Sequence, residues 1–381
     1  MEAWATMFYG ANMSSSPSFS GLRALVSSIR LLDGLRPIVV LTTPETAARR
    51  DRAAAALEEA NAPLSWAPVD PPAINNRACI ARLDKKERAG TQKQAGMRDM
   101  FIKLAVWNLT QYSRVLYVDA DALVLRPLDE LWAVPLASTQ IAAAAMAISA
   151  KPGRAEHPCA AGHKVWGTRK YNAGVLLVRP SSAVHATALL ALSRKGGAGI
   201  RFDCADGDQH LFNVLARPRT RCVGQTYNCR DPTFLTTQGW PSAHADRFSR
   251  CLQPGEPPRP SPERRNLNGT DSAQALQGAF PPSQPGAYQH GGSLAPGAQE
   301  PPLLPHVIHF AMTTKPWLDK HRAWLQPSSC FVFYRLWAHA LTLTRARPPP
   351  APGPRDAAGG AGWAVEAVST LMAGCTTHKG G

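Results

Sequence analysis

Two carboxylates, Asp119 and Asp121, stand one residue apart between two apolar runs. The run before them, residues 115–118, is β-prone and typical of a buried strand in a covered sheet. Ala120 lets the chain turn tightly, so that both carboxylates can reach one hard cation. Carboxylate oxygens suit Mg²⁺ or Mn²⁺, which keep open positions for substrate phosphates. The pattern therefore indicates a metal–diphosphate site at a strand end. The alternative is an ordinary turn in which an Asp caps the next helix.

The chain before this motif alternates between strand-like and helical patterns. Short apolar runs are separated by segments with apolar residues at helical spacing. A strand–helix–strand–helix–strand order is typical of a parallel sheet in a nucleotide-binding α/β domain. The expected elements are strands at 3–9, 37–41 and 64–69, a helix at about 22–32 capped by Ser18 or Ser20, a helix at 44–60, and a helix at 101–109 that leads into the strand at 115–118.

Two further segments are less regular. Residues 79–96, before the motif, are polar and predict a mobile surface loop. Residues 141–148 are rich in Ala and fit either a strand or a helix. The other expected elements are strands at 173–178, 223–227 and 306–310, and helices at 128–132, 182–195, 206–216 and 331–346.

Composition divides the chain into four parts. Residues 253–304 are rich in Pro, Gly, Ser and Gln and bury too little apolar surface to offset their ordering entropy, which predicts a disordered insertion. The main part of the folded domain is then 1–252, and residues 305–346 complete it with a final helix. Residues 347–381 form a low-complexity tail.

The net charge of +15 raises the hypothesis of nucleic-acid binding. Lys and Arg are scattered without a basic block, so we expect no nucleic-acid partner. We also expect no membrane span in this chain, because no apolar run is long enough. The eight cysteines include no C-x-x-C pair, and the spacing of Cys204, Cys222, Cys229 and Cys251 allows a disulfide without requiring one. A soluble cytoplasmic protein is the expectation. The Golgi lumen is the alternative, if a longer amino terminus carries an anchor.

Four segments resemble one family in the same order. The first runs from Lys103 through the D-A-D motif to Trp132 and resembles glycosyltransferase family 8, in particular the glycogenin and plant glycogenin-like glucuronosyltransferase group. The Asn-Ala-Gly-Val at 172–175 is similar to the family's N-S-G-V segment. The others are the Gly-Asp-Gln at 207–209 and the His-Phe at 309–310 with the Lys-Pro-Trp at 315–317. The resemblance implies a GT-A type α/β fold with a mixed, mainly parallel sheet.

The resemblance also implies site residues. Asp119, Asp121 and His309 would bind Mn²⁺, with Mg²⁺ as the alternative. The implied catalytic residues are Asp208, Gln209 and Lys315, of which Lys315 would neutralise the leaving diphosphate. Lys103 would contact the donor. Its position in an otherwise apolar helix also allows the alternative that its side chain extends to solvent. The implied donor-binding residues are Met7, Tyr9, Lys103, Asp119, Ala120, Asp121, Asn172, Ala173, Asp208, Gln209, His309, Met312 and Lys315. Ala173 and Met312 stand where the family carries Ser and Gly.

The implied activity is retaining transfer of a hexosyl or glycuronosyl group from a UDP-sugar to an acceptor hydroxyl. The acceptor would be a glycan, a glycolipid or a protein, and the enzyme could act as a homodimer. Glycogenin glucosylates its own tyrosine shortly after a Tyr-Asn pair that Tyr227-Asn228 resembles, but here the next tyrosine is Tyr288, in the predicted insertion. We therefore expect a separate acceptor, with self-glycosylation slow or absent. The alternative function is a catalytically weak scaffold that binds a nucleotide sugar or a glycan.

Overall fold

The computed structural model describes residues 1–9, 16–61, 63–88, 98–137, 140–145, 171–193, 200, 204, 207–216, 220–230, 306–310 and 340. Two predicted site residues, Met312 and Lys315, lie outside these ranges. The predicted insertion at 253–304, the tail at 347–381 and nearly all of the predicted helix at 331–346 also lie outside them. These predictions therefore stay predictions.

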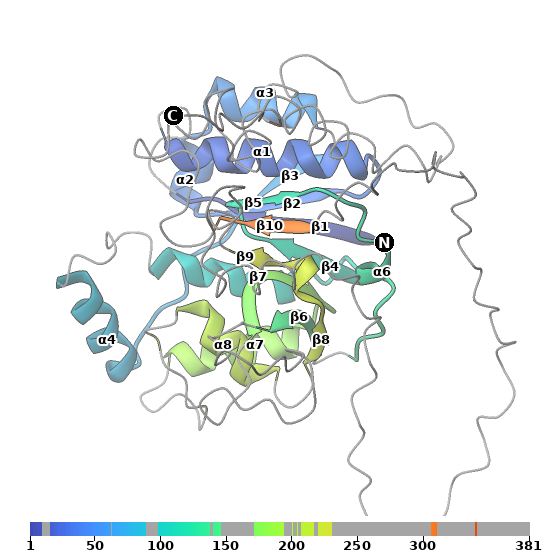
Figure 1. Ribbon diagram of the computed structural model, residues 1–381. Coiled ribbons are helices and arrows are strands. Elements are labelled where there is room, and N and C mark those ends of the chain that lie inside the picture. Colours follow the sequence, from blue (N-terminus) through green and yellow to red (C-terminus); the bar gives the residue numbers. More distant parts are fainter. Residues whose placement is uncertain are drawn as a thin grey trace, which may run out of the picture.

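A seven-stranded mixed sheet forms the centre of the described fold (Figure 1). In spatial order its strands are β3 (Leu64–Pro68), β2 (Ile38–Thr42), β1 (Glu2–Met7), β4 (Arg114–Val118), β7 (Tyr171–Val178), β6 (Ile141–Ala145) and β8 (Arg221–Val223). The first four strands run parallel to one another, and β6 is parallel to β8. Only β7 runs against its two neighbours, β4 and β6. The predicted mixed, mainly parallel α/β sheet is confirmed.

Helices cover both faces of this sheet (Figure 1). One apolar cluster joins the sheet to α1 and α3, and a second joins its other face to η1, α7 and α8. Leu116 and Val118 of β4 belong to the first cluster, whereas Val115 and Tyr117 belong to the second. Burial on both faces explains why β4 has an uninterrupted apolar sequence. The helices are α1 (Pro17–Leu32), α2 (Pro44–Ala48), α3 (Arg52–Ala60), α4 (Arg77–Arg88), α6 (Asp129–Trp132), α7 (Ser182–Ser193) and α8 (Asp208–Leu215), with the 3₁₀ helices η1 (Met100–Asn108) and η4 (Gln225–Tyr227).

A three-stranded sheet beside the first one brings together three segments that lie far apart in the sequence. Its order is β5 (Ala122–Val124), β10 (Val307–His309) and β9 (Cys229–Arg230). The central strand, β10, is antiparallel to β5 and parallel to β9. Its register places His309 opposite Ala122, the residue that follows the D-A-D motif.

Several local predictions were wrong in instructive ways. The loop predicted at 79–96 begins as a helix, α4, because Cys79 and Leu83 lie four residues apart and bury one face of it. The single helix predicted at 44–60 is two helices, since the Asp51 side chain accepts from the N–H groups of Ala53 and Ala54 and starts α3 anew.

Other differences concern element type and ends. The helix predicted at 101–109 is the 3₁₀ helix η1, and α1 begins at Pro17, before the predicted Ser caps. The ambiguous segment at 141–148 contains strand β6. The strand predicted at 223–227 is not formed there, because β8 ends at Val223 and residues 225–227 form η4.

Cys79 and Cys204 form a disulfide that ties α4 to the segment preceding α8. Cys222 and Cys229 are disulfide-bonded as well. The sequence left any bridge open and did not single out Cys79. Among the described residues, no helix is both long and apolar enough to cross a membrane.

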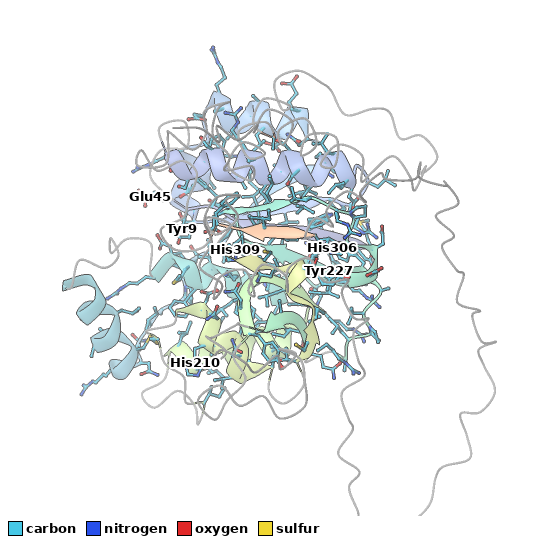
Figure 2. All side chains as sticks on the ribbon, in the orientation of Figure 1. Tyr9, Glu45, His210, Tyr227, His306 and His309 are labelled. Carbon is cyan, nitrogen blue, oxygen red and sulfur yellow. A yellow bond between two sulfur atoms is a disulfide. The ribbon has the colours of Figure 1, made fainter. Side chains whose placement is uncertain are left out.

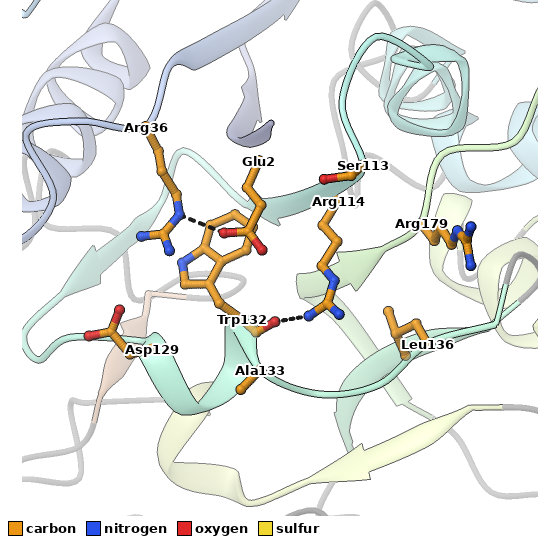
Figure 3. A pocket seen from close by; sticks show the side chains of 9 residues that line it. All are labelled: Glu2, Arg36, Ser113, Arg114, Asp129, Trp132, Ala133, Leu136 and Arg179. Atoms are coloured by element: carbon orange, nitrogen blue, oxygen red, sulfur yellow. Dashed lines mark hydrogen bonds and ion pairs between the residues drawn. The ribbon is translucent and has the colours of Figure 1, made fainter. Parts of the chain in front are cut away.

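A cavity of about 630 Å³ opens where the parallel strands β1 and β4 begin (Figure 3). Arg36 pairs with Glu2 at 2.9 Å and lies 4.6 Å from the ring centre of Trp132. Arg114 donates to the Trp132 carbonyl. These charges thus have partners within the cavity wall, and the cavity lies at the edge opposite the D-A-D motif.

Candidate active site

The turn that holds Asp119 and Asp121 is fixed at both ends. Asp119 N–H donates to the Gly174 carbonyl of β7 at 2.8 Å, and Ala122 N–H donates to the Asp119 carbonyl at 3.0 Å. Both carboxylates remain partly open to solvent, with 19% and 16% of their side chains exposed. The strand end therefore presents two carboxylates outward, as the sequence pattern indicates.

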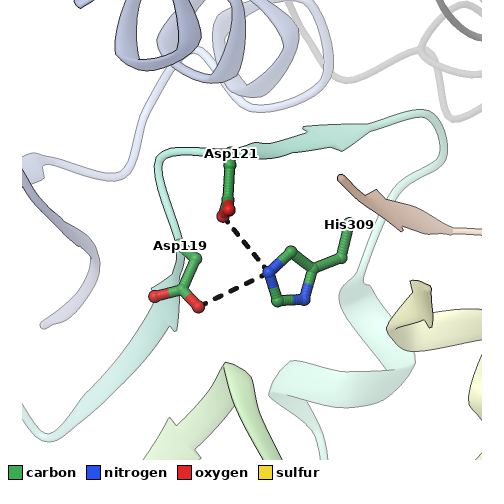
Figure 4. Close-up of side chains that lie close together, drawn as sticks. All are labelled: Asp119, Asp121 and His309. Carbon is green, nitrogen blue, oxygen red and sulfur yellow. Dashed lines mark ion pairs between the residues drawn. The ribbon is translucent and has the colours of Figure 1, made fainter. Parts of the chain in front are cut away.

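His309 reaches the same place from β10. Phe310 N–H donates to the Asp121 carbonyl at 2.8 Å and aligns the strand with the turn. The Nε2 atom of His309 lies 3.2 Å from Asp121 Oδ1 and 3.6 Å from Asp119 Oδ2 (Figure 4). One ligand atom from each residue lies within 4.8 Å of the others. Two carboxylate oxygens and one imidazole nitrogen form a donor set that can hold a divalent metal ion.

Tyr117 holds the second oxygen of Asp119, a contact that sequence reasoning missed. Its hydroxyl donates to Asp119 Oδ1 at 2.7 Å, and the side chain is fully buried. Burial and the adjacent Asp119 raise the pKa of Tyr117 well above its ordinary value, so the phenol stays a donor. The available signal was a phenol in an otherwise aliphatic buried strand, because a buried tyrosine hydroxyl usually finds a partner.

Lys103 connects two acidic groups inside the protein. Its Nζ lies 2.9 Å from Asp119 Oδ1, 2.7 Å from Asp208 Oδ2 and 3.3 Å from the Ala173 carbonyl. The side chain is 3% exposed, so the alternative of a lysine that extends to solvent is wrong. Burial lowers the pKa of Lys103, but the two carboxylates outweigh that effect and raise it above its ordinary value. Lys103 is thus a permanent buried cation.

Asp208 begins helix α8 behind this lysine. The preceding Gly207 has φ 61°, a backbone conformation that favours glycine, and a Cβ there would also displace the flexible Met100 side chain. Burial raises the pKa of Asp208, while Lys103 opposes the rise. Tyr9 follows the end of β1. Burial raises the pKa of its hydroxyl group, and the negative charge of Asp208 raises it further.

Asn172, Gln209 and Asn228 form the remaining polar wall. Asn172 Nδ2 donates to Gln209 Oε1 at 2.9 Å, and Asn228 Nδ2 donates to Asn172 Oδ1 at 2.7 Å. Asn228 Oδ1 lies 3.0 Å from His309 Nδ1. Sequence reasoning assigned no role to Asn228.

The described site therefore brings together most of the predicted residues. Direct contacts join Lys103, Asp119, Asp121, Asn172, Asp208, Gln209 and His309, and the Ala173 backbone takes part. Met7 ends β1 and pairs with Leu41, whereas Ala120 forms the turn between the two carboxylates.

The family model for glycosyl transferase family 8 matches residues 37–240. The chain belongs to this family. Family membership and the observed sheet together give it a GT-A fold. The family 8 chain is 28% identical over 148 residues to a glycogenin of Neurospora crassa, a match that covers 39% of this chain and 16% of the relative. It is 31% identical over 87 residues to UDP-glucuronate:xylan alpha-glucuronosyltransferase 2 of Arabidopsis thaliana, covering 23% of this chain and 11% of that relative.

Two solved structures are also similar to this family 8 chain. The galactosyltransferase LgtC, in complex with donor and acceptor sugar analogues, is 16% identical with a TM-score of 0.48, over 94% of this chain and all of the other. The glycosyltransferase GlyE of Streptococcus pneumoniae TIGR4 is 15% identical with a TM-score of 0.46, over 92% of this chain and 67% of the other.

Proposed function

We propose that this chain transfers a hexosyl or glycuronosyl group from a UDP-sugar to an acceptor hydroxyl, with retention of configuration and dependence on Mn²⁺. The observation that carries the proposal is the convergence of Asp119, Asp121 and His309 within 4.8 Å at the carboxyl end of β4. Such strand ends are where ligands bind in open α/β sheets. A bound divalent cation would hold the donor diphosphate and offset the negative charge that develops on it.

The protein residues around that position divide the remaining work. Asp208 and Gln209 begin α8, next to the Lys103 ion pair, and are our candidates for contact with the sugar near its anomeric carbon. Lys103 already uses three acceptors, which is the donor capacity of an ammonium. We therefore assign it to holding Asp119 and Asp208. Lys315 for the leaving diphosphate, and Met7, Tyr9, Ala120, Ala173 and Met312 for donor binding, are proposed from the family resemblance.

The name of one relative contains UDP-glucuronate, which supports a glycuronosyl donor, and a hexosyl donor is proposed from the family resemblance. The absence of tyrosine from residues 229–287 favours a separate glycan, glycolipid or protein acceptor over self-modification. The alternative, a nucleotide-sugar-binding scaffold, would bind UDP with the metal but would not cleave any donor.

The test is a screen of UDP-sugars for Mn²⁺-dependent hydrolysis, together with calorimetry of UDP binding. Asp121→Asn removes a charged ligand at constant size, so it should abolish metal-dependent UDP affinity. Asp129→Asn, which changes an exposed carboxylate on α6 at the opposite edge, is the matched control and should bind as the parent does. Unchanged metal-dependent affinity in Asp121→Asn would refute the metal assignment. Binding without hydrolysis of any donor would favour the scaffold.

The disulfides support an oxidising compartment, such as the Golgi lumen, over the cytoplasm. Cys79 and Cys204 are bridged, and Cys222 and Cys229 are bonded too. Disulfides are rare in cytosolic proteins, where thiols are kept reduced. We expect peptides with Cys79 and Cys204 to resist alkylation in the native chain purified from its source, and to react after reduction. Full alkylation before reduction would favour the cytoplasm.

A further inference from the structure

Four side chains form an unbroken series of hydrogen bonds from the metal-binding histidine to the start of α8. His309 Nδ1 meets Asn228 Oδ1 at 3.0 Å, Asn228 Nδ2 meets Asn172 Oδ1 at 2.7 Å, and Asn172 Nδ2 meets Gln209 Oε1 at 2.9 Å. Asn228, His309 and Asn172 are 4%, 4% and 7% exposed. Asn228 is the member that touches both the histidine and the amide pair.

Two backbone N–H groups set the direction of every bond in this series. Gly174 N–H lies 2.9 Å from Asn172 Oδ1, and Ala173 N–H lies 3.3 Å from Gln209 Oε1. A backbone N–H can only donate, so these two side-chain atoms must be carbonyl oxygens. Asn172 Oδ1 therefore receives a second hydrogen bond from the NH₂ group of Asn228, which leaves the Asn228 carbonyl oxygen facing His309.

This direction determines the tautomer of His309. Because Asn228 Oδ1 is an acceptor, the Nδ1 atom that faces it must carry a hydrogen. In the neutral ring Nε2 then holds a lone pair, and this atom faces Asp119 Oδ2 and Asp121 Oδ1. Three electron-pair donors converge on one point, an arrangement that a divalent cation satisfies.

We propose that Asn228 is a positioning residue that fixes His309 in the metal-binding tautomer and, through its NH₂ group, holds Asn172 and Gln209 in place. The proposal rests on the proposed function and extends it, because it makes one buried amide responsible for both the metal ligand and the sugar-facing side chains. Outer-shell partners of metal-binding histidines fix ring orientation, and their loss typically costs about 10–100-fold in metal affinity.

The first experiment reads the tautomer directly in the metal-free protein. The chain has 11 histidines, so uniform ¹⁵N-histidine labelling with long-range ¹H–¹⁵N correlation spectra, and His309→Gln for assignment, isolates the signal of this ring. We expect the Nδ1–H tautomer. The Nε2–H tautomer in the parent protein would overturn the proposal, whether or not the protein transfers a sugar.

The second experiment separates the two hydrogen bonds of Asn228. Asn228→Asp keeps an acceptor for His309 but loses the donor to Asn172, so Mn²⁺ affinity should stay within about threefold of the parent while donor turnover falls about 10-fold or more. Asn228→Leu, of similar size, loses both bonds. It should lower Mn²⁺ affinity about 10–100-fold and shift His309 away from the Nδ1–H tautomer.

Calorimetry with MnCl₂, donor hydrolysis and thermal melting are measured on the same samples. Parent-like Mn²⁺ affinity in Asn228→Leu, or an equal fall of affinity and turnover in Asn228→Asp, would overturn the proposal. If Asn228→Leu does not melt cooperatively, the parent tautomer and the Asn228→Asp variant decide the matter. If the parent itself binds no Mn²⁺, the proposed function fails, a result distinct from a wrong tautomer.

Discussion

Lys103 is the residue at which the Asp119–Asp121 turn and α8 meet. Its ammonium lies within 3.0 Å of both Asp119 and Asp208, and the ring centre of Tyr117 is 4.8 Å from it. Burial raises the pKa of Asp208 above its ordinary value, and the negative charge of Asp119 raises it further, against the opposing effect of Lys103. A single buried cation between them makes their close approach tolerable.

Replacing Lys103 should therefore destabilise the fold in the metal-free state. Lys103→Met keeps the length of the side chain but leaves two carboxylates facing each other without a cation. We expect the free energy of unfolding, measured by urea denaturation, to fall by about 3 kcal/mol or more. Arg52→Met, at an exposed position of α3, is the control and should change it by less than about 0.5 kcal/mol. Similar losses in both variants would contradict this role.

Strand β7 passes so close to β10 that only glycine fits between them. A Cβ on Gly174 would overlap the imidazole ring of His309 and the Asn172 side chain. Its carbonyl also accepts from Asp119 N–H. The requirement at this point is one of space, because Gly174 is not among the positive-φ glycines. The packing of two strands thus decides where the histidine lies.

Gly174→Ala should displace His309 and weaken metal binding. We expect Mn²⁺ affinity, measured by calorimetry, to fall about 10-fold or more, because a ligand moved by even a small distance loses its coordination geometry. Gly34→Ala is the matched control, since a Cβ there meets nothing within 4 Å. Parent-like affinity in Gly174→Ala would mean that His309 moves freely or does not bind the metal.

At the scale of the whole domain, strand β10 is held by contacts with residues far from it in the sequence. His306 stacks on Tyr227 with ring centres 4.5 Å apart and bonds to Thr226 through Nδ1 at 3.0 Å. Tyr227 in turn donates to Glu130 of α6 at 2.7 Å. Figure 2 shows His306 and His309 at opposite ends of β10, with Tyr227 beside His306. Burial, aided by Arg126, lowers the pKa of His306 from 6.5 to about 3.

This shift predicts how the free energy of unfolding depends on pH. Between pH 6.5 and about 3 the unfolded chain protonates His306 while the folded chain does not, so stability is lost as pH falls through that range. The slope from this group approaches about 1.4 kcal/mol per pH unit. Urea denaturation at several pH values should show a smaller loss for His306→Phe than for the parent. Parallel curves would show that His306 does not contribute.

Local sequence patterns determined much of this protein. The apolar run of β4 and the D-A-D motif predicted a buried strand that ends in a carboxylate turn. The strand–helix order predicted the parallel half of the sheet, and short motifs located Asn172, Asp208 and His309. These features depend on neighbouring residues, since side-chain periodicity and turn chemistry act over a few positions.

Tertiary structure alone decided which of these segments meet. Nothing local indicates that β10 pairs with β5, that Lys103 lies between Asp119 and Asp208, or that Asn228 receives a bond from His309. The Cys79–Cys204 bridge was missed for the same reason. Such contacts join residues far apart in sequence, and their geometry follows from the packing of whole elements around the sheet, which no local spacing encodes.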